Sequence, residues 1–453
     1  MPHQKLARRK PDAARTLAYA TLRAVTGEDA YANLELGRRL SEAHLEARDA
    51  AFATELVSGT CRLMGTYDRI IAAASGRPTE KLQPEVLDAL RLGAHQVLSM
   101  RVPSRAAVAA TVDLAGAEVG ERVVGLTNAV LRKVDARTLD EWVAELSRDE
   151  DALGALALRT HHPRWIAEEY VRLLGDEAEE ALAANNVSPV PTLVVRPGLA
   201  TVAELDGEPT RWSPYGARRP GNPGDVRAVR EGRAGVQDEG SQLAALALAR
   251  AAHGQSGRPW LDLCAGPGGK AALLVGLAIE HGTRLVAAEL QPHRAQLVSQ
   301  ALRGYASFDL APEVLCADGT EPPWSPGSFG AVLADVPCSG LGALRRRPES
   351  RWRRLPADVT ALVPLQKRLL DSALRAAEPG GVVAYVTCSP HHAETVEVVR
   401  DVLATTAVPA RLGVAHDQIP VPGVDDATFV QLWPHRHGTD AMFITLIHVT
   451  GAE

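Results

Sequence analysis

The 453-residue chain lacks any apolar run long enough to cross a membrane. A membrane-spanning helix needs roughly 18 or more consecutive apolar residues, and no stretch approaches that length. The basic start, MPHQKLARRKPD, is not followed by the apolar segment of a secretory signal. We therefore expect a cytoplasmic protein without a membrane partner.

The sequence also lacks closely paired cysteines. None of the five stands in a C-x-x-C pair, which argues against a zinc knuckle and a disulfide framework. His391 and His392 have no partners at ligand spacing, so no metal is expected. The cysteines are Cys61, Cys264, Cys316, Cys338 and Cys388.

An excess of positive charge is missing as well. The net charge of −6 argues against wholesale wrapping of nucleic acid but allows a local basic patch. The length predicts two or three domains rather than one core. We expect the chain to act as a monomer.

Three segments differ in pattern. Residues 1–137 carry apolar residues at helical spacing, with Pro84 near one helix start, which predicts an all-α bundle. Residues 138–235 mix a helical stretch with Pro-rich and β-branched runs and are interpreted as a small α+β connecting subdomain, with a possible role in RNA recognition. Residues 236–453 alternate short apolar strands with amphipathic helices, which indicates a Rossmann-like, doubly wound α/β domain.

The stretch LDLCAGPGGKAALL, 261–274, predicts a strand, a glycine-rich turn and a helix start. Glu289 stands 21 positions after Gly268 (289 − 268) at the next strand end, a spacing that suits a carboxylate bonded to ribose, and Asp318 follows the third strand. A tight structural turn is the alternative interpretation. Because the turn is not G-x-G-x-x-G, its Pro-Gly-Gly-Lys sequence favours S-adenosylmethionine over a dinucleotide. The expected cofactor contacts are Cys264, Ala265, Gly266, Pro267, Gly268, Gly269, Lys270, Glu289, Asp318 and Asp335.

Two cysteines follow strands of the α/β segment, Cys338 in ADVPCSG and Cys388 in YVTCSP. Ligands of open α/β sheets bind beyond the carboxyl ends of the strands, so both thiols are expected near the cofactor. A thiolate beside a methyl donor suggests addition to carbon 6 of a pyrimidine and methylation of carbon 5. Asp335 is expected to bond the base, which would have to be flipped out of its stack. Cys61 and Cys316 are interpreted as packing residues.

These motifs, with AAEL, CADG, RRRPESRWRR and LWPHRHGTDAMF, resemble those of RNA cytosine-5 methyltransferases of the Fmu/Sun type. Residues 1–137 resemble the NusB-type RNA-binding domain through RDAAFATELVSGTCR and LTNAVLRKV. Together the resemblances cover nearly the whole chain. They imply that 16S ribosomal RNA is the substrate.

The resemblance also assigns roles to the two cysteines. It implies that Cys388, in the TCS motif, is the nucleophile and that Cys338 assists product release. Alone, Cys338 would have been the first choice. The family often has an acidic pair and an asparagine after TCS, and here only Glu394 remains of these three.

A run of arginines follows Cys338. Such a run is usually a solvated face, but beside a pocket for a flipped base it is expected to clamp RNA phosphates. Trp352 could stack on a base or pack within the protein. Two other functions stay open, a transfer RNA methyltransferase and a non-catalytic RNA-binding or ribosome-assembly protein. The expected RNA contacts are Arg345, Arg346, Arg347, Arg351, Trp352, Arg353 and Arg354.

Overall fold

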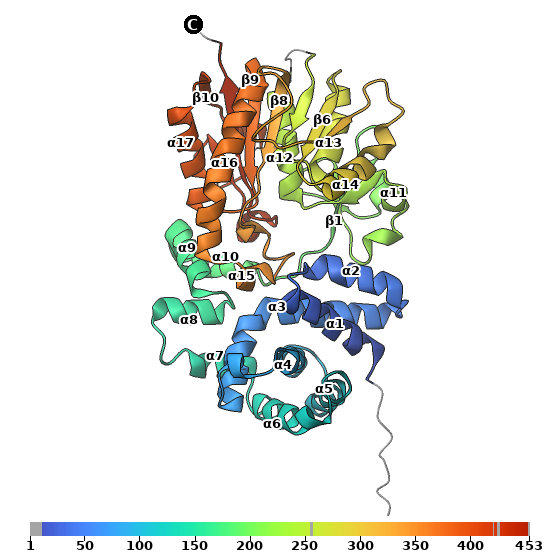
Figure 1. Cartoon of the computed structure of the whole chain (residues 1–453), viewed down its shortest axis with the longest axis vertical. Coiled ribbons are helices and arrows are strands. Elements are labelled where there is room, and N and C mark those ends of the chain that lie inside the picture. Colours follow the sequence, from blue (N-terminus) through green and yellow to red (C-terminus); the bar gives the residue numbers. More distant parts are fainter. Residues whose placement is uncertain (1–10, 254–256, 420, 424–425, 452–453) are drawn as a thin grey trace, which may run out of the picture. The chain divides into compact units, whose positions relative to one another are not determined.

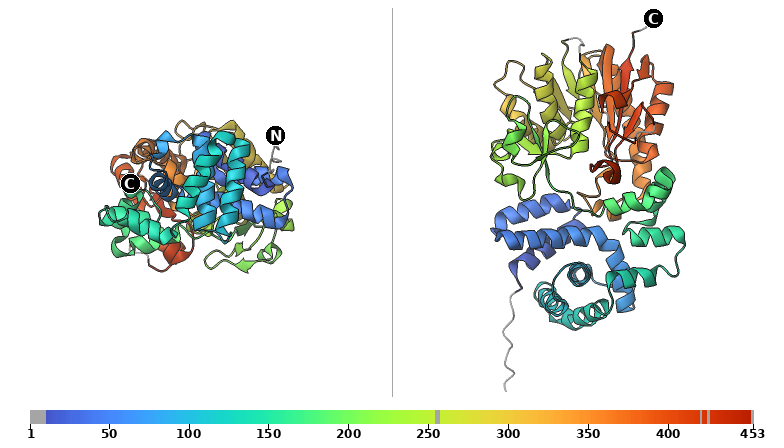
Figure 2. Two further views of the ribbon diagram at one scale, coloured as in Figure 1. Left: turned by 90° about the horizontal axis from the view of Figure 1, so that it is seen from below. Right: turned by 180° about the vertical axis from the view of Figure 1, so that it is seen from behind.

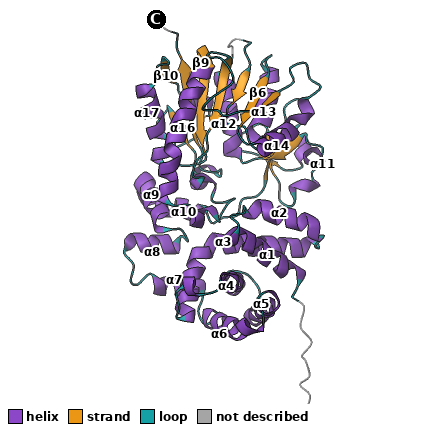
Figure 3. Ribbon diagram, in the orientation of Figure 1, coloured by secondary structure: helices purple, strands orange, loops and turns teal. Residues whose placement is uncertain are grey.

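The computed structural model describes residues 11–253, 257–419, 421–423 and 426–451, so nearly all of the basic start lies outside the described residues. The chain forms two compact units, one of Met1–Val187 with Leu344–Arg354 and one of Ser188–Ala343 with Leu355–Glu453. Strands occur in the second unit, whereas the described part of the first is helical (Figure 3). None of the described helices has the length and apolar character needed to span a membrane.

The first unit is the helical bundle that the sequence predicts (Figure 1). Pro84 is the first residue of its helix, where the missing amide proton costs nothing. The longest helix ends at Gly76, which takes a left-handed conformation with φ of 68°. The helices of this unit are α1 (Ala13–Gly27), α2 (Ala32–Ala43), α3 (Ala47–Ser75), α4 (Pro84–Leu98), α5 (Ser104–Glu118), α6 (Val124–Val134), α7 (Leu139–Leu146), α8 (Ala152–Arg159), α9 (Arg164–Leu174), α10 (Ala178–Ala184) and α15 (Ser350–Arg353).

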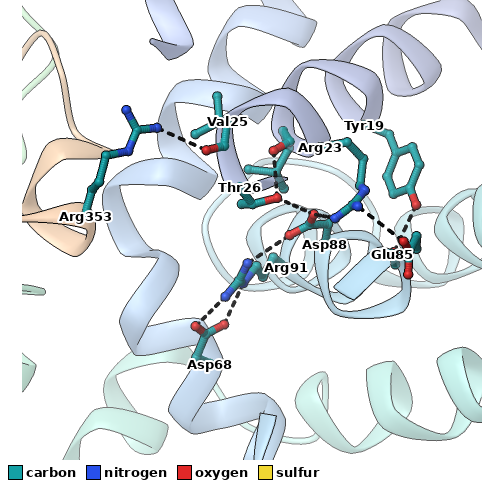
Figure 4. A network of polar contacts seen from close by, with 10 residues as sticks. Tyr19, Arg23, Val25, Thr26, Asp68, Glu85, Asp88, Arg91 and Arg353 are labelled. Carbon is teal, nitrogen blue, oxygen red and sulfur yellow. Dashed lines mark hydrogen bonds and ion pairs between the residues drawn. The ribbon is translucent and has the colours of Figure 1, made fainter. Parts of the chain in front are cut away.

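A buried carboxylate ties three helices of this bundle together (Figure 4). Asp88 of α4 accepts hydrogen bonds from Arg23 at 2.7 Å and from Thr26 at 2.6 Å, both on α1. It also accepts one from Arg91 at 2.8 Å, and Arg91 in turn donates to Asp68 of α3. Because a buried charge is costly unless it is paired and hydrogen-bonded, this network fixes how α1, α3 and α4 pack.

The second unit begins with a small antiparallel sheet in the order β2-β3-β1-β4. The Pro-rich run SPVPTLVV leads into its central strand, as expected for β-branched residues. Its elements are β1 (Thr192–Val195), β2 (Glu208–Pro209), β3 (Gly216–Arg218), β4 (Ala234–Val236) and α11 (Arg227–Arg230).

The large sheet of the second unit has the order β10-β12-β9-β8-β5-β6-β7, with β11 paired to β12. Strands β5 to β9 are parallel, whereas β10, β11 and β12 join by antiparallel pairing. The strands are β5 (Trp260–Asp262), β6 (Leu285–Glu289), β7 (Glu313–Cys316), β8 (Phe329–Asp335), β9 (Ala377–Thr387), β10 (Ala410–Leu412), β11 (Phe429–Gln431) and β12 (Phe443–Val449). The helices are α12 (Glu239–Ala251), α13 (Gly269–Glu280), α14 (Pro292–Leu302), α16 (Pro356–Ala376), α17 (Val396–Thr405), α18 (Ala415–Gln418) and α19 (Pro434–His437).

Helices cover both faces of this sheet, which confirms the Rossmann-like α/β class. Helices α12, α13 and α14 pack in one apolar core and α16 and α17 in another, on opposite faces of the strands (Figure 1). The last apolar segment, AMFITLIHV, forms strand β12, which lies between β9 and β10 and not at the sheet edge. Figure 2 shows the sheet from behind.

The division into two units differs from the expected boundaries at 137/138 and 235/236. Helices α7 to α10 belong to the helical unit, and the small sheet belongs to the unit with the large sheet. The excursion Leu344–Arg354 also belongs to the helical unit. Hydrophobic periodicity does not show in which of two units such a short segment packs.

Candidate active site

The glycine-rich turn lies between β5 and α13 and is held by Glu289, the last residue of β6. The Glu289 carboxylate accepts the Gly266 amide at 3.0 Å and the Gln291 amide at 3.0 Å. A Cβ atom on Gly266 would lie 2.1 Å from a Glu289 oxygen, so a side chain at this position would displace the Glu289 carboxylate from the turn. Gly268 has φ of 104° and starts α13, leaving amide groups of the helix N-terminus directed outward.

Asp262, at the end of β5, carries a buried carboxyl group whose two oxygens accept no hydrogen bond of normal geometry among the described residues. Burial, with repulsion from Asp335, raises the pKa of this carboxyl to about 8, although the Cys264 amide favours the charged form. A cationic ligand group nearby, such as the ammonium or sulfonium of S-adenosylmethionine, would favour the charged form of this carboxyl, so the site suits such a ligand. Asp262 was not among the residues expected from the sequence. Its acidic side chain at a strand end was the signal that could have identified it.

Lys270, in the first turn of α13, donates to Asp335 at the end of β8 with an N–O distance of 2.8 Å. Strands β5 and β8 are neighbours where the strand order reverses, and ligands bind at such a switch point. Burial lowers the pKa of Lys270, but the Asp335 charge outweighs it and leaves the pKa raised. A lysine in the first turn of a helix is often merely solvated, but Lys270 has a defined partner in Asp335.

Cys338 and Cys388 lie together just beyond the end of the β8–β9 ladder, at Asp335 and Val386. Their sulfur atoms are 3.3 Å apart. The hydrogen bond to Cys388, with burial adding to it, raises the pKa of the Cys338 thiol well above its ordinary value. Cys338 therefore keeps its proton at neutral pH.

The other residues singled out in the sequence differ from one another in burial and in hydrogen bonding. Asp318 follows β7, and its carboxylate accepts the amide and hydroxyl of Thr320, which lowers its pKa. Burial raises the pKa of the Cys264 thiol well above its usual value, in keeping with a role for its backbone. Cys61 is buried, as a packing residue should be, but Cys316 is exposed, so the packing interpretation of Cys316 is wrong. Strand β7 is an edge strand, and hydrophobic patterning cannot tell which of its faces is covered.

The arginine-rich segment 345–354 packs inside the helical unit. Arg351 is fully buried and donates to the carbonyl oxygens of His161 and Asn185 at 3.0 and 3.1 Å. Burial lowers the pKa of Arg351 to about 9, which still leaves it charged at neutral pH. Arg353 donates to the carbonyl oxygens of Val25, Asp29 and Ala30 in the same unit, and Figure 4 shows the bond to Val25.

The remaining members of this segment differ in exposure. The Trp352 indole donates to the Cys61 carbonyl at 2.8 Å and lies against Gly65, so the structure shows the packing alternative for this side chain. Arg345 is buried, Arg347 and Arg354 are half-buried, and Arg346 is exposed. An RNA contact by these residues stays a prediction.

Comparisons with known proteins agree with this architecture. The profile of the family described as 16S rRNA methyltransferase RsmB/F matches residues 248–448, and that of the NusB family matches residues 12–136. A putative methyltransferase of Mycobacterium tuberculosis is 49% identical over 98% of this chain and 98% of its own. A probable ribosomal RNA small subunit methyltransferase B of Synechocystis is 32% identical, over 84% of this chain and 86% of its own. The crystal structure of PH0851 shares the fold, with a TM-score of 0.81, 22% identity and coverage of 98% of this chain and 100% of that one.

The geometry of the site and the similarity to known methyltransferases therefore both indicate a cofactor site at the carboxyl ends of the parallel strands of the large sheet. The turn closed on Glu289, the unpartnered carboxylate of Asp262 and the helix N-terminus of α13 form a fitting site for S-adenosylmethionine, the cofactor of this enzyme class. The chain belongs to the 16S rRNA methyltransferase RsmB/F family and is an S-adenosylmethionine-dependent RNA methyltransferase with an N-terminal NusB domain.

Proposed function

We propose that this enzyme methylates carbon 5 of a cytosine in 16S ribosomal RNA by covalent catalysis. The observation that carries the proposal is the pair of thiols, Cys338 and Cys388, 3.3 Å apart beyond β8 and β9. A single nucleophile would explain one thiol at the carboxyl edge of the sheet. Two thiols in contact suit a reaction that both forms and resolves a protein–RNA adduct.

Cys388 is assigned as the nucleophile. Its partner Cys338 holds its proton, because the hydrogen bond to Cys388 and burial raise the Cys338 pKa. The proton that Cys338 keeps can be shared with the Cys388 sulfur, which favours negative charge on Cys388. The Cys388 thiolate then adds to carbon 6 of the flipped cytosine, forming a carbon–sulfur bond and moving electron density onto carbon 5.

The Gly266 turn, Glu289 and Asp262 would hold S-adenosylmethionine, which would supply an electrophilic methyl group for carbon 5. Asp335, fixed by Lys270 at 2.8 Å, bonds the base edge and supports the charge that develops on the ring. A base then removes the proton from carbon 5, and the electron pair of that bond restores the ring double bond as sulfur leaves carbon 6. Cys338, in contact with the departing sulfur, assists this release.

The test is transfer of labelled methyl groups to 16S RNA from unmodified ribosomes, with transfer RNA as a parallel substrate. We expect Cys388→Ala to abolish transfer. We expect Cys338→Ala to accumulate a protein–RNA adduct that survives denaturation. Cys316→Ala, at an exposed cysteine, serves as the matched control and should behave as the unaltered protein. Adduct accumulation in Cys388→Ala instead would reverse the assignment, and transfer to transfer RNA alone would change the substrate.

A further inference from the structure

A buried carboxylate that the proposed mechanism does not use connects the two cysteine loops. Glu394 ends the short turn His392–Glu394 and is fully buried. Its Oε1 accepts the Ser339 amide at 2.7 Å and the Gln366 side-chain amide at 3.0 Å. Its Oε2 accepts the Ser389 hydroxyl at 2.7 Å and also the Ser339 hydroxyl. Four donors therefore meet one carboxylate, which matches the acceptor capacity of that group.

These donors all belong to the surroundings of the two cysteines. Ser339 directly follows Cys338, and Ser389 directly follows Cys388. The two serine hydroxyls are 3.1 Å apart. Gln366 of α16 also donates to the carbonyl of Pro337, directly before Cys338, at 2.9 Å. One carboxylate thus joins both cysteine loops and links them to α16.

Both cysteines lie just beyond the paired strands. The β8–β9 ladder ends at Asp335 and Val386, and β9 pairs with β12 up to Thr387, so side chains after these residues must fix the two sulfur atoms. One backbone hydrogen bond, from the Gly342 amide to the Cys388 carbonyl at 2.9 Å, joins the Cys388 loop to the segment that follows Cys338. The serine–carboxylate contacts add the side-chain bonds between the two loops, at the residues that directly follow the two cysteines.

We propose that Glu394 is a positioning residue of the methyl-transfer reaction, because its carboxylate holds the Cys338 and Cys388 loops so that the two sulfur atoms stay in contact. The proposal rests on the proposed two-cysteine function. A buried carboxylate costs free energy unless its hydrogen bonds are complete, so the four donors and the acceptor fix each other. Glu394 acts through the loops and does not itself touch the reacting atoms.

A series of substitutions separates position from charge. Glu394→Gln keeps the length and one acceptor oxygen, and its NH2 group can donate to the two serine hydroxyls, which can turn to accept, so we expect methyl transfer to fall by no more than about threefold. Glu394→Asp keeps the charge but shortens the reach by one methylene. We expect Glu394→Asp and Glu394→Ala to lower kcat by about 100-fold, the scale on which a small misplacement of catalytic groups acts.

The affinity for S-adenosylmethionine should stay unchanged in all three variants, because Glu394 has no bond to the Gly266 turn or to Glu289 among the described residues. Glu397→Gln, at an exposed glutamate in the first turn of α17, is the matched control and should resemble the unaltered protein.

A second readout measures the loop geometry without any RNA. Diamide, an azo compound, takes two electrons and two protons from a pair of thiols, which join as a disulfide while diamide becomes a hydrazine. In the full-length protein we expect rapid formation of the Cys338–Cys388 disulfide, mapped by mass spectrometry after alkylation of the remaining thiols. The rate should fall about tenfold or more in Glu394→Ala and Glu394→Asp, because sulfur atoms held apart meet less often. It should be retained in Glu394→Gln and Glu397→Gln.

The two readouts distinguish failure of this proposal from failure of the proposed function. Unchanged disulfide formation and unchanged kcat in a folded Glu394→Ala protein would overturn the positioning role. If Glu394→Ala does not fold, Ser389→Ala removes one of the two loop contacts and should slow both processes to an intermediate extent, and no effect on either would overturn the proposal. If the unaltered protein methylates no cytosine while the disulfide rates follow the expected order, the positioning role stands and the proposed function falls.

Discussion

Lys270 Nζ lies 2.8 Å from Asp335 Oδ2, which joins the first turn of α13 to the end of β8. The two residues are far apart in sequence but meet because β5 and β8 are adjacent in the sheet. The ammonium is largely buried, with 13% of its side chain exposed, and the carboxylate side chain is 28% exposed. Each charge therefore depends on the other for compensation.

Lys270→Met is expected to lower methyl transfer by about 100-fold, because Asp335 loses the partner that orients it toward the base. The free energy of unfolding should fall by about 1–3 kcal/mol, less than for a fully buried pair because solvent screens the partly exposed carboxylate. Single-turnover kinetics and urea unfolding measure the two effects. Lys367→Met removes the 2.6 Å surface pair with Asp401 and is the control, expected to change neither. Unchanged methyl transfer by Lys270→Met would show that Lys270 has no role in the active site.

Gly266→Ala is expected to weaken S-adenosylmethionine binding by at least about tenfold, because the added Cβ would lie 2.1 Å from the Glu289 carboxylate and would force the turn away from it. Equilibrium dialysis with labelled cofactor measures the change. Gly235→Ala, where the added Cβ meets nothing within 4 Å, is the control. Equal affinities for both variants would show that the turn tolerates a side chain.

Hydrophobic periodicity and turn chemistry were sufficient to predict the helical bundle, the α/β class and the glycine turn. The bundle start at Pro84 and the strand-turn-helix around Gly266 follow from local rules, and the structure has both. The proximity of Cys338 and Cys388 was predictable from parallel strands alone, because both follow strands whose carboxyl ends meet at one edge.

The contacts missed by sequence reasoning depend on long-range packing. Nothing in RRRPESRWRR indicates that Arg351 and Trp352 turn into the helical unit, since an arginine run is usually solvated. The unpartnered state of Asp262 and the four donors around Glu394 arise only once separate strands and α16 converge. Local propensity contains no information on such convergence.

Asp262→Asn is expected to flatten the pH dependence of stability. Burial raises the pKa of Asp262 to about 8, whereas an unfolded aspartate titrates near pH 4. Between about pH 4 and about pH 8 the folded protein therefore holds a proton that the unfolded chain has released, and its stability falls as the pH rises through this interval. Asparagine has no such proton, so the variant should gain in melting temperature relative to the unaltered protein as the pH rises from 5 to 8, by on the order of a few degrees.

Thermal unfolding from pH 5 to pH 9 measures this difference. Asp309→Asn, at an exposed aspartate of the same unit, is the control and should follow the unaltered protein. Parallel pH profiles for Asp262→Asn and the unaltered protein would contradict a raised Asp262 pKa.

Arg351→Ala and Arg346→Ala are expected to separate packing from RNA binding. Arg351 is buried with its guanidinium on carbonyl oxygens of the helical unit, so its loss leaves a cavity and unpaired acceptors that should cost about 2–4 kcal/mol. Hydrogen exchange should accelerate in α3 and α9 of that unit. Arg346 is exposed, so Arg346→Ala should leave exchange unchanged and instead weaken RNA binding and reduce its salt dependence by about one counterion. Faster exchange in Arg346→Ala, or unaltered exchange in Arg351→Ala, would contradict this division between the two arginines.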